Sequence, residues 1–247
     1  MMIRHTYTLI DEGSFSETDY WDECREEVFD SVRNVYWPPE SGKFVVHPEE
    51  NVNGVNPITE QFENNLDSKP GWQSTGRRWL NNLLQELGIL DDALEKLHEY
   101  YDDPLEFISS PWFDAMKQVG DESELVVAEW ETGNISSSHR SLNRITLGLV
   151  AGIIAGGFIV LPNRDLYYYL TDRIGNYREL EPYFLIWESL AYEVENGIIE
   201  VIVVEHDGVS NEVPPIGKLT DGMADREVPD VDQMTSGREQ QAGLEDY

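Results

Sequence analysis

The segment from residue 112 to residue 144 constrains the fold of this chain most strongly, because it contains two strand patterns joined by a short turn. The two apolar runs flank a four-residue loop, which predicts an antiparallel hairpin in which Val119 faces Glu124. This register places Asp114 directly opposite Glu129. The Cβ atoms of directly opposed residues lie roughly 5 Å apart. Two carboxylates are therefore expected side by side on one face of a sheet.

A third carboxylate is expected on the same face. Glu131 lies two residues beyond Glu129, and successive side chains of a strand point to opposite faces, so Trp130 between them points into the core. Like charges that face each other are destabilising unless a cation neutralises them. Mg²⁺ takes carboxylate oxygens together with waters and substrate phosphates, so the cluster suits metal-assisted phosphodiester hydrolysis. The alternative is a solvated strand face, because Glu-x-Glu recurs elsewhere among the 48 acidic residues.

The same residues resemble the catalytic core of a known nuclease superfamily. Asp114 followed by residues 129–131, Glu-Trp-Glu, is similar to the PD-(D/E)XK motif. Most members of that superfamily carry Lys at the third position, and the acid found here resembles the type II restriction endonucleases of the BamHI and BglII branch. The proline of the motif appears only as Pro111, three residues before the first acid, which leaves Asp121 as an alternative to Asp114.

The resemblance extends over about residues 35 to 205. It includes the stretch from Asn53 to Ile58 and the Gly71-Trp72 pair, which are similar to the region upstream of the core in BamHI-like archaeal proteins. It implies an α/β fold with a central mixed β-sheet flanked by helices, that is, a restriction-endonuclease-like core. It also implies a Mg²⁺-dependent endonuclease that cleaves short palindromic sites in double-stranded DNA as a homodimer, with Mn²⁺ as a substitute for Mg²⁺.

The resemblance also implies roles for individual residues. Asp114 and Glu129 would hold the metal together with the backbone carbonyl of Trp130, and Glu131 would orient or deprotonate the attacking water. In this family the helix upstream of the core can supply a further acid. Two glutamates of the helix expected after Pro57 are candidates for that position: Glu60 and Glu63.

The segment after Glu131 is expected to form a helix that carries hydroxyl and basic side chains. Ser136, Ser137 or Ser138 can cap it, and helix N-termini favour phosphate. Arg164 follows a buried strand, and ligands of open α/β sheets lie beyond the carboxyl ends of strands. The alternative is that the arginines pair with surface acids. The candidates for DNA contact are Ser136, His139, Arg140, Asn143, Arg144 and Arg164.

The net charge of −31 on 247 residues is accompanied by an ordinary hydrophobic fraction of 40%. Charge of this size repels itself, so the acids are expected on the surface of a folded body in a halophile, whose salt shortens the Debye length to about 3 Å at 1 M. The chain lacks the excess positive charge that marks most nucleic-acid-binding proteins. DNA recognition would therefore depend on hydrogen bonds and shape at a local cleft.

Strand and helix patterns predict one α/β domain over residues 1–208, with a core at about 55–205 and an N-terminal extension at 1–50. Residues 209–247 are polar and acidic and are predicted to form a disordered tail. Besides the hairpin, strands are expected at 5–10, 43–48, 158–161 and 198–204, and helices at 16–37, 57–66, 75–101, 166–174 and 182–194.

Cys24 is the only cysteine, which excludes an internal disulfide, and no apolar run near the N-terminus is long enough for a signal peptide. A cytoplasmic protein is therefore expected. The uncharged stretch 145–161 has 17 residues, fewer than the roughly 20 that span a bilayer. It predicts a buried helix, a turn at Gly156-Gly157 and a buried strand. Two alternatives to a nuclease are a non-catalytic DNA-binding or regulatory protein with the same fold and a protein anchored to a membrane by this stretch.

Overall fold

The computed structural model describes residues 1–74, 82, 84–85, 88, 90–99, 102–104, 113–120, 124–171 and 174–218. The chain divides into two compact units, Met1–Gly217 and Lys218–Tyr247. The helices and strands of the described residues all lie in the first unit.

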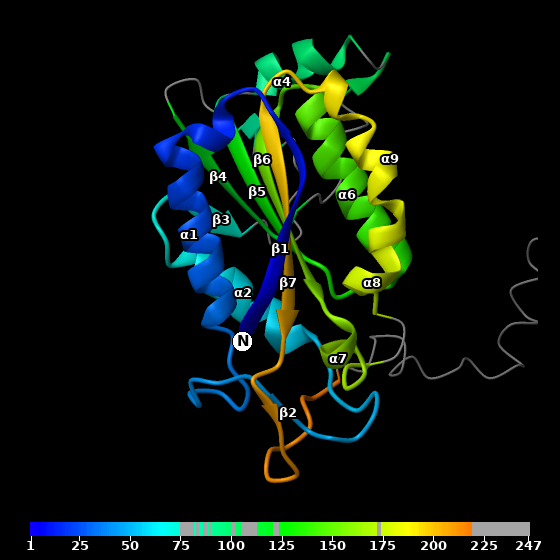
Figure 1. Cartoon of the computed structure of the whole chain (residues 1–247). Helices are drawn as coiled ribbons and strands as arrows, with labels where there is room; N and C mark the ends of the chain where they lie inside the picture. The colour runs from blue at the N-terminus through cyan, green and yellow to red at the C-terminus, as the bar shows by residue number, and fades with distance from the viewer. Residues whose placement is uncertain are drawn as a thin grey trace, which may run out of the picture. The chain divides into compact units, whose positions relative to one another are not determined.

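Six strands form a mixed sheet in the order β1-β7-β6-β5-β4-β3 (Figure 1). The strands β5, β6 and β7 are parallel neighbours, while β1, β4 and β3 are antiparallel to the strands they join. The bounds are β1 Met2–Glu12, β3 Trp72–Ser74, β4 Ala115–Val119, β5 Glu124–Trp130, β6 Ile154–Pro162 and β7 Gly197–Glu205. Two short strands, β2 Val45–Val46 and β8 Gly208–Val209, pair in parallel as a separate sheet.

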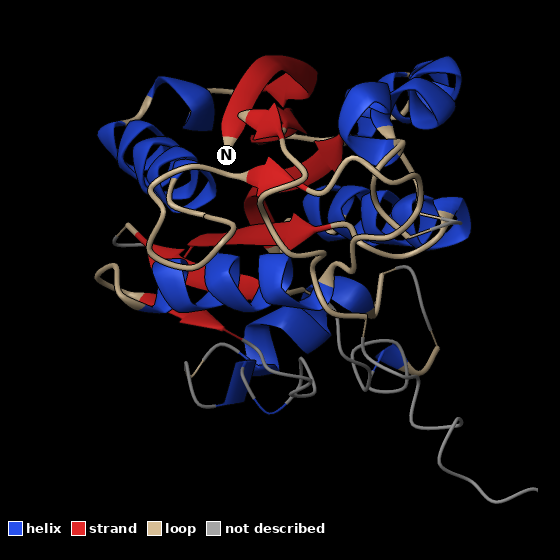
Figure 2. Cartoon of the chain, turned by 90° about the horizontal axis from the view of Figure 1, so that it is seen from below, coloured by secondary structure: helices blue, strands red, loops and turns tan. Residues whose placement is uncertain are grey.

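Helices cover both faces of the six-stranded sheet (Figures 1 and 2). One face carries α1 (Asp19–Arg33) and α2 (Asn56–Asp67), and the other carries α6 (Ile135–Val150), α8 (Tyr177–Leu180) and α9 (Phe184–Glu188). The other helical segments are α4 Leu90–Leu97, α7 Arg164–Tyr167, and the 3-10 turns η1 Phe15–Glu17, η2 Glu181–Tyr183 and η3 Ala191–Glu193. This architecture confirms the predicted α/β class with a mixed central sheet flanked by helices.

Side chains alternate along β5 between two separate cores. Val126, Ala128 and Trp130 are buried in the core that includes α1 and α2, whereas Leu125 and Val127 are buried in the core that includes α6. Full burial of one such side chain contributes about 1.5–3 kcal/mol, and a shift by one residue would exchange the two sets. The face that each residue of β5 takes is therefore strongly fixed, and Glu129 lies on the α6 side.

The predicted turn at Gly156 and Gly157 is wrong. Both glycines lie inside β6, and the turn after α6 is made at Gly152, whose φ is +62°. A Cβ on Gly156 would lie 2.7 Å from the ring of Trp21, and a Cβ on Gly157 would collide with the side chain of Ile145. These positions are glycine because helices pack closely on both faces of β6. None of the helices in the described ranges has the length and apolar character needed to cross a membrane.

Other segments differ in extent from their predictions. Residues 1–50, expected as an extension, contribute β1 and α1 to the body of the fold. The helix expected at 182–194 is broken into η2, α9 and η3. At the predicted end of the domain, β8 forms at Gly208–Val209, and Ile216 is buried further on, so the first unit reaches Gly217.

Some predictions fall on residues outside the described ranges. Of the helical run expected at 75–101, α4 is described and most of the preceding part is not. The end of the helix expected at 166–174 includes residues 172 and 173, which lie outside the description, and α7 ends at Tyr167. The predicted tail from residue 219 onward also lies outside it.

Candidate active site at the carboxyl end of the central strands

The β4–β5 hairpin has the predicted register. Val119 pairs with Glu124 and Ala115 pairs with Ala128, so Asp114, which immediately precedes β4, comes opposite Glu129. The backbone N–H of Asp114 donates to Glu129 Oε2 at 2.9 Å. The two acids are therefore held together at the carboxyl end of β5.

The carboxylate of Asp114 caps this end of the strand. The backbone N–H of Trp130 donates to Asp114 Oδ2 at 2.7 Å, because β4 has no residue left in its ladder to accept that hydrogen bond. The N–H and C=O of a strand residue point to the same side, so the carbonyl of Trp130 faces the same edge. The Asp114 carboxylate and the Trp130 carbonyl therefore lie at the same edge, beyond the start of β4, and the Glu129 carboxylate lies next to the Asp114 backbone.

Glu131 follows directly after β5, and its backbone N–H donates to the carbonyl of Val160 at 3.0 Å. Its buried carboxylate accepts hydrogen bonds from two hydroxyls of α6, from Ser141 at 2.7 Å to Oε1 and from Ser138 at 3.1 Å to Oε2. The Ser141 hydroxyl also lies 3.1 Å from Glu129 Oε1. The predicted placement of both glutamates on one face of the sheet is therefore confirmed.

Burial makes the negative charge of this cluster costly. It raises the pKa of Asp114 from 3.8 to about 7; the Trp130 amide opposes the rise, and the charges of Glu63 and Glu131 add to it. Burial and then the charges of Asp114 and Glu131 raise the pKa of Glu129 well above its usual range. A site in which carboxylates resist ionisation in this way gains stability when a cation binds.

The pKa of Glu131 is also raised, mainly by burial. Hydrogen bonds from Ser141 and Ser138 and the positive charges of Arg140 and Arg144 act in the opposite direction. Both arginines are therefore close enough to Glu131 for their charges to favour its ionised form. Neither of them forms an ion pair with an acid within the part of the chain that the structure describes.

The two candidates for a further acid on α2 differ in position. Glu63 is half-buried, its pKa is raised mainly by burial, and its charge raises the pKa of Asp114. Glu60 is exposed, and it acts on the pKa of Glu63. Of the two, Glu63 is the one whose charge raises the pKa of Asp114.

The predicted DNA-contact residues differ in what their side chains contact. The His139 ring packs against the rings of Tyr183 at 4.8 Å and Trp187 at 5.4 Å, and Asn143 Oδ1 accepts a 2.9 Å hydrogen bond from Trp187 Nε1. His139 and Asn143 therefore both contact Trp187 of α9. In contrast, the side chain of Arg164 is exposed at the carboxyl end of β6.

The helix cap was predicted at the wrong residue. The side chain of Asn134 accepts hydrogen bonds from the backbone N–H groups of Ser136 and Ser137, so Asn134 is the N-cap of α6 and no serine caps it. Ser136 is exposed in the first turn.

The comparison with known families agrees with this geometry. The model of the family described as restriction endonuclease BamHI matches residues 1–223. The chain belongs to this family.

Two curated relatives of the BamHI family are similar over most of their length. The type II restriction enzyme OkrAI of Oceanobacter kriegii is 35% identical over 226 residues, which cover 92% of this chain and 100% of the relative. The type II restriction enzyme BamHI of Bacillus amyloliquefaciens is 35% identical over 205 residues, which cover 82% and 83%. Among solved structures, restriction endonuclease BglII complexed with a DNA 16-mer aligns with a TM-score of 0.47 and 11% identity over 84% of this chain and 79% of that chain.

The donor set of this BamHI-family chain fits a hard divalent cation. Carboxylates and a carbonyl are the oxygen ligands that Mg²⁺ takes, and the raised pKa values of Asp114 and Glu129 indicate negative charge that the protein itself does not neutralise. As the side chains stand, no three His, Cys, Asp or Glu residues in the described ranges are gathered closely enough to enclose an ion. Waters and substrate oxygens would complete the shell, as Mg²⁺ requires in general.

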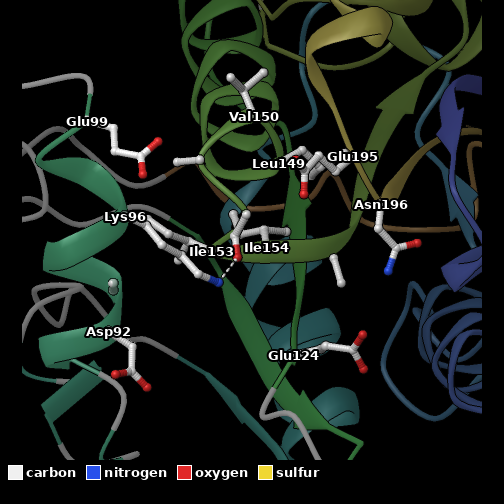
Figure 3. A pocket seen from close by; sticks show the side chains of 14 residues that line it. Asp92, Lys96, Glu99, Glu124, Leu149, Val150, Ile153, Ile154, Glu195 and Asn196 are labelled. Atoms are coloured by element: carbon white, nitrogen blue, oxygen red, sulfur yellow. Dashed lines mark hydrogen bonds between the residues drawn. The ribbon is translucent and has the colours of Figure 1, made fainter.

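A cavity of about 480 Å³ lies at the other end of the sheet (Figure 3). Its lining includes Glu124 and Ile154, the first residues of β5 and β6, and the side chain of Lys96 crosses to donate to the carbonyl of Gly152 at 2.6 Å. Glu124 and Glu129 stand at opposite ends of β5, so this cavity is separate from the acid cluster.

Sequence reasoning missed Ser138 and Ser141 as partners of the acids. Their spacing of three residues places them on one side of a helix, and this was the available signal. Which elements that side faces could not be read from the sequence.

Proposed function

We propose that this chain is a Mg²⁺-dependent endonuclease that hydrolyses phosphodiester bonds in double-stranded DNA as a type II restriction enzyme does. The observation that carries the proposal is the adjacency of Asp114 and Glu129 at the end of β5, with the buried Glu131 joined to Glu129 through the Ser141 hydroxyl, in a chain of the BamHI family. A binding protein without catalysis has no use for neighbouring carboxylates whose ionisation is opposed by burial and by each other's charge.

Asp114, Glu129 and the carbonyl of Trp130 would hold the metal, with Mn²⁺ as a substitute for Mg²⁺. When bound, the ion would stabilise charge on the phosphoryl oxygens and lower the pKa of a coordinated water. The protein's own part is to keep the two carboxylates adjacent, which it does through the Asp114 N–H bond to Glu129. Glu63 would contribute to the same negative field from α2.

Glu131 would orient the attacking water or accept its proton. A general base is most effective when its pKa is raised toward the working pH, and burial raises the pKa of Glu131. Two hydroxyls hold the carboxylate in one orientation. The proton would leave the water oxygen for a carboxylate oxygen of Glu131.

The DNA backbone would contact the arginines nearest the acids. Arg140 and Arg144 act on the charge of Glu131, and Arg164 is exposed at the neighbouring strand end. Guanidinium groups bind phosphate through paired hydrogen bonds, and the exposed Ser136 could add a further one. We assign His139 and Asn143 to the packing of α9 against α6, since both contact Trp187.

A homodimer would form through an apolar surface around α9. Within ten residues, five large side chains are exposed, and we call them the α9 patch: Tyr183, Leu185, Ile186, Leu190 and Tyr192. Leu185 is 73% exposed and Ile186 is 57% exposed. Contiguous apolar patches on soluble proteins mark interaction sites, and a two-fold dimer presents the same patch twice. Such symmetry suits a palindromic DNA site.

The excess of acids, with 48 against 17 bases, suggests a halophilic, cytoplasmic enzyme whose surface repulsion is screened by salt. The test is therefore done in molar KCl. Purified protein is incubated with a long duplex DNA and Mg²⁺ or Mn²⁺, and discrete fragments are expected. E129A should lose cleavage by at least 1,000-fold, the order expected for loss of a central catalytic group. E26A, which removes an exposed acid of α1, is the control. Cleavage by E129A at the rate of E26A would refute the proposal.

A further inference from the structure

Two hydroxyls of α6 hold the carboxylate of Glu131, which forms no ion pair with any residue that the structure describes. Ser138 and Ser141 are both buried, and each donates to a different oxygen of the carboxylate. They lie three residues apart on the same side of the helix as Leu142 and Ile145, which are buried in the core beneath it. Two hydroxyls on two oxygens fix both the position and the rotation of the carboxylate plane.

Ser141 also joins the two glutamates. Its Oγ lies 2.7 Å from Glu131 Oε1 and 3.1 Å from Glu129 Oε1. A serine hydroxyl has one proton to donate, and the shorter distance is the one to Glu131. The same oxygen thus sets how far apart the two carboxylates lie.

The Ser138 hydroxyl packs closely against Gly175. A Cβ on Gly175 would lie 2.5 Å from Ser138 Oγ, and the backbone N–H of Gly175 donates to the carbonyl of Gly133 at 2.8 Å. The chain before α8 is therefore held against both the start of α6 and the turn after Glu131. No larger side chain fits at position 175 without displacing the hydroxyl.

We propose that Ser138 and Ser141 are positioning residues that hold Glu131 in the orientation needed to act on the attacking water. Ser141 additionally fixes the separation of Glu131 from Glu129. This assignment rests on the proposed function, because it gives Glu131 its task. In this assignment both serines act through the carboxylate of Glu131 and not directly on substrate or metal.

The test compares S141A and S138A with S31A. Ser31 is also fully buried, and its hydroxyl donates to the carbonyl of Glu27 within α1, so S31A deletes the same group away from the acids. Misplacement of a reacting group by 1 Å can cost on the order of 100-fold in rate. S141A should lower kcat about 10- to 100-fold with the KM for DNA within threefold of wild type, S138A should lower kcat less, and S31A should leave it unchanged.

Two further measurements separate positioning from other effects. The Kd for Mn²⁺, measured by calorimetry on the protein without DNA, should stay within threefold in S141A, and S141T, which restores a hydroxyl, should recover part of kcat. A crystal structure of S141A should show a rotated Glu131 carboxylate. S141A that cleaves at the wild-type rate, or that loses Mn²⁺ affinity more than tenfold, would overturn the inference. If wild type cleaves no DNA, the proposed function fails instead, and the crystal structure still decides whether Ser141 orients Glu131.

Discussion

Asp114 is predicted to make the metal-free protein less stable as the pH rises. Its pKa is about 7 in the fold against an ordinary value of 3.8. Below pH 3.8 the carboxyl is protonated in both the folded and the unfolded chain. Between pH 3.8 and about 7 the unfolded chain loses this proton while the folded chain keeps it, so the free energy of unfolding falls with pH. Above pH 7 both states have lost this proton, and the free energy of unfolding does not fall further on account of Asp114.

The expected change in the free energy of unfolding follows from the raised pKa of Asp114. Each pKa unit corresponds to about 1.4 kcal/mol, so a rise from 3.8 to about 7 corresponds to roughly 4 kcal/mol. Asp114 titrates together with Glu129 and Glu131, and part of that free energy belongs to the cluster as a whole. We therefore expect D114N to stabilise the metal-free protein by about 2–4 kcal/mol at pH 8 and by little at pH 4. The asparagine retains an oxygen to accept the Trp130 N–H bond.

The assay is urea unfolding in EDTA at pH 4, 6 and 8 and constant molar KCl. D11N, which neutralises an exposed aspartate of β1, corrects for the general loss of one charge from an acidic chain. Addition of Mg²⁺ at pH 8 should stabilise wild type more than D114N and so reduce the difference. The reasoning is refuted if D114N is destabilised at pH 8, or if its stability depends on pH as strongly as that of D11N.

Two further predictions concern α2 and the α9 patch. E63A should lower the cleavage rate at least tenfold and raise the Mg²⁺ concentration needed for half-maximal rate, because Glu63 adds to the negative field at Asp114. E60A should have a smaller effect. Equal effects of the two substitutions in a titration of Mg²⁺ would contradict this prediction. I186E should convert the dimer into monomers in sedimentation velocity, since it places a charge in an apolar interface. Y20E, which changes an exposed tyrosine of α1, should leave the dimer intact. An unchanged sedimentation coefficient for I186E would place the interface elsewhere.

The hairpin could be predicted because its determinants are local. A four-residue turn and strict alternation fix the register, and the buried side chains Val126, Ala128 and Trp130 leave only one choice of face. The convergence of Asp114 with Glu129 then follows from the register alone. The mixed α/β sheet was predictable from the strand and helix patterns together with the family resemblance.

Local patterns failed at two places, the glycine pair of β6 and the start of α6. The glycines at 156 and 157 look like a turn, but they are required by Trp21 and Ile145, which pack on opposite faces of β6. The run of three serines looks like a set of helix caps, yet Asn134 takes that position, because its side chain reaches the first free N–H groups of α6. The residues that require glycine in β6 lie far away in the sequence or on another element. At the start of α6, a neighbouring residue takes the cap position that the serines could have taken.

The sequence by itself determined that Asp114 comes opposite Glu129 and that Glu131 shares the face of Glu129, since the period of a strand and the length of a turn suffice for that. Only the tertiary structure decided how α6 is rotated above them. That rotation turns Ser138 and Ser141 toward the acids and His139 and Asn143 toward α9, although all four lie within six residues. Successive helical residues point about 100° apart, and the side that meets the sheet is selected by burial of Leu142 and Ile145 against strands that lie elsewhere in the chain.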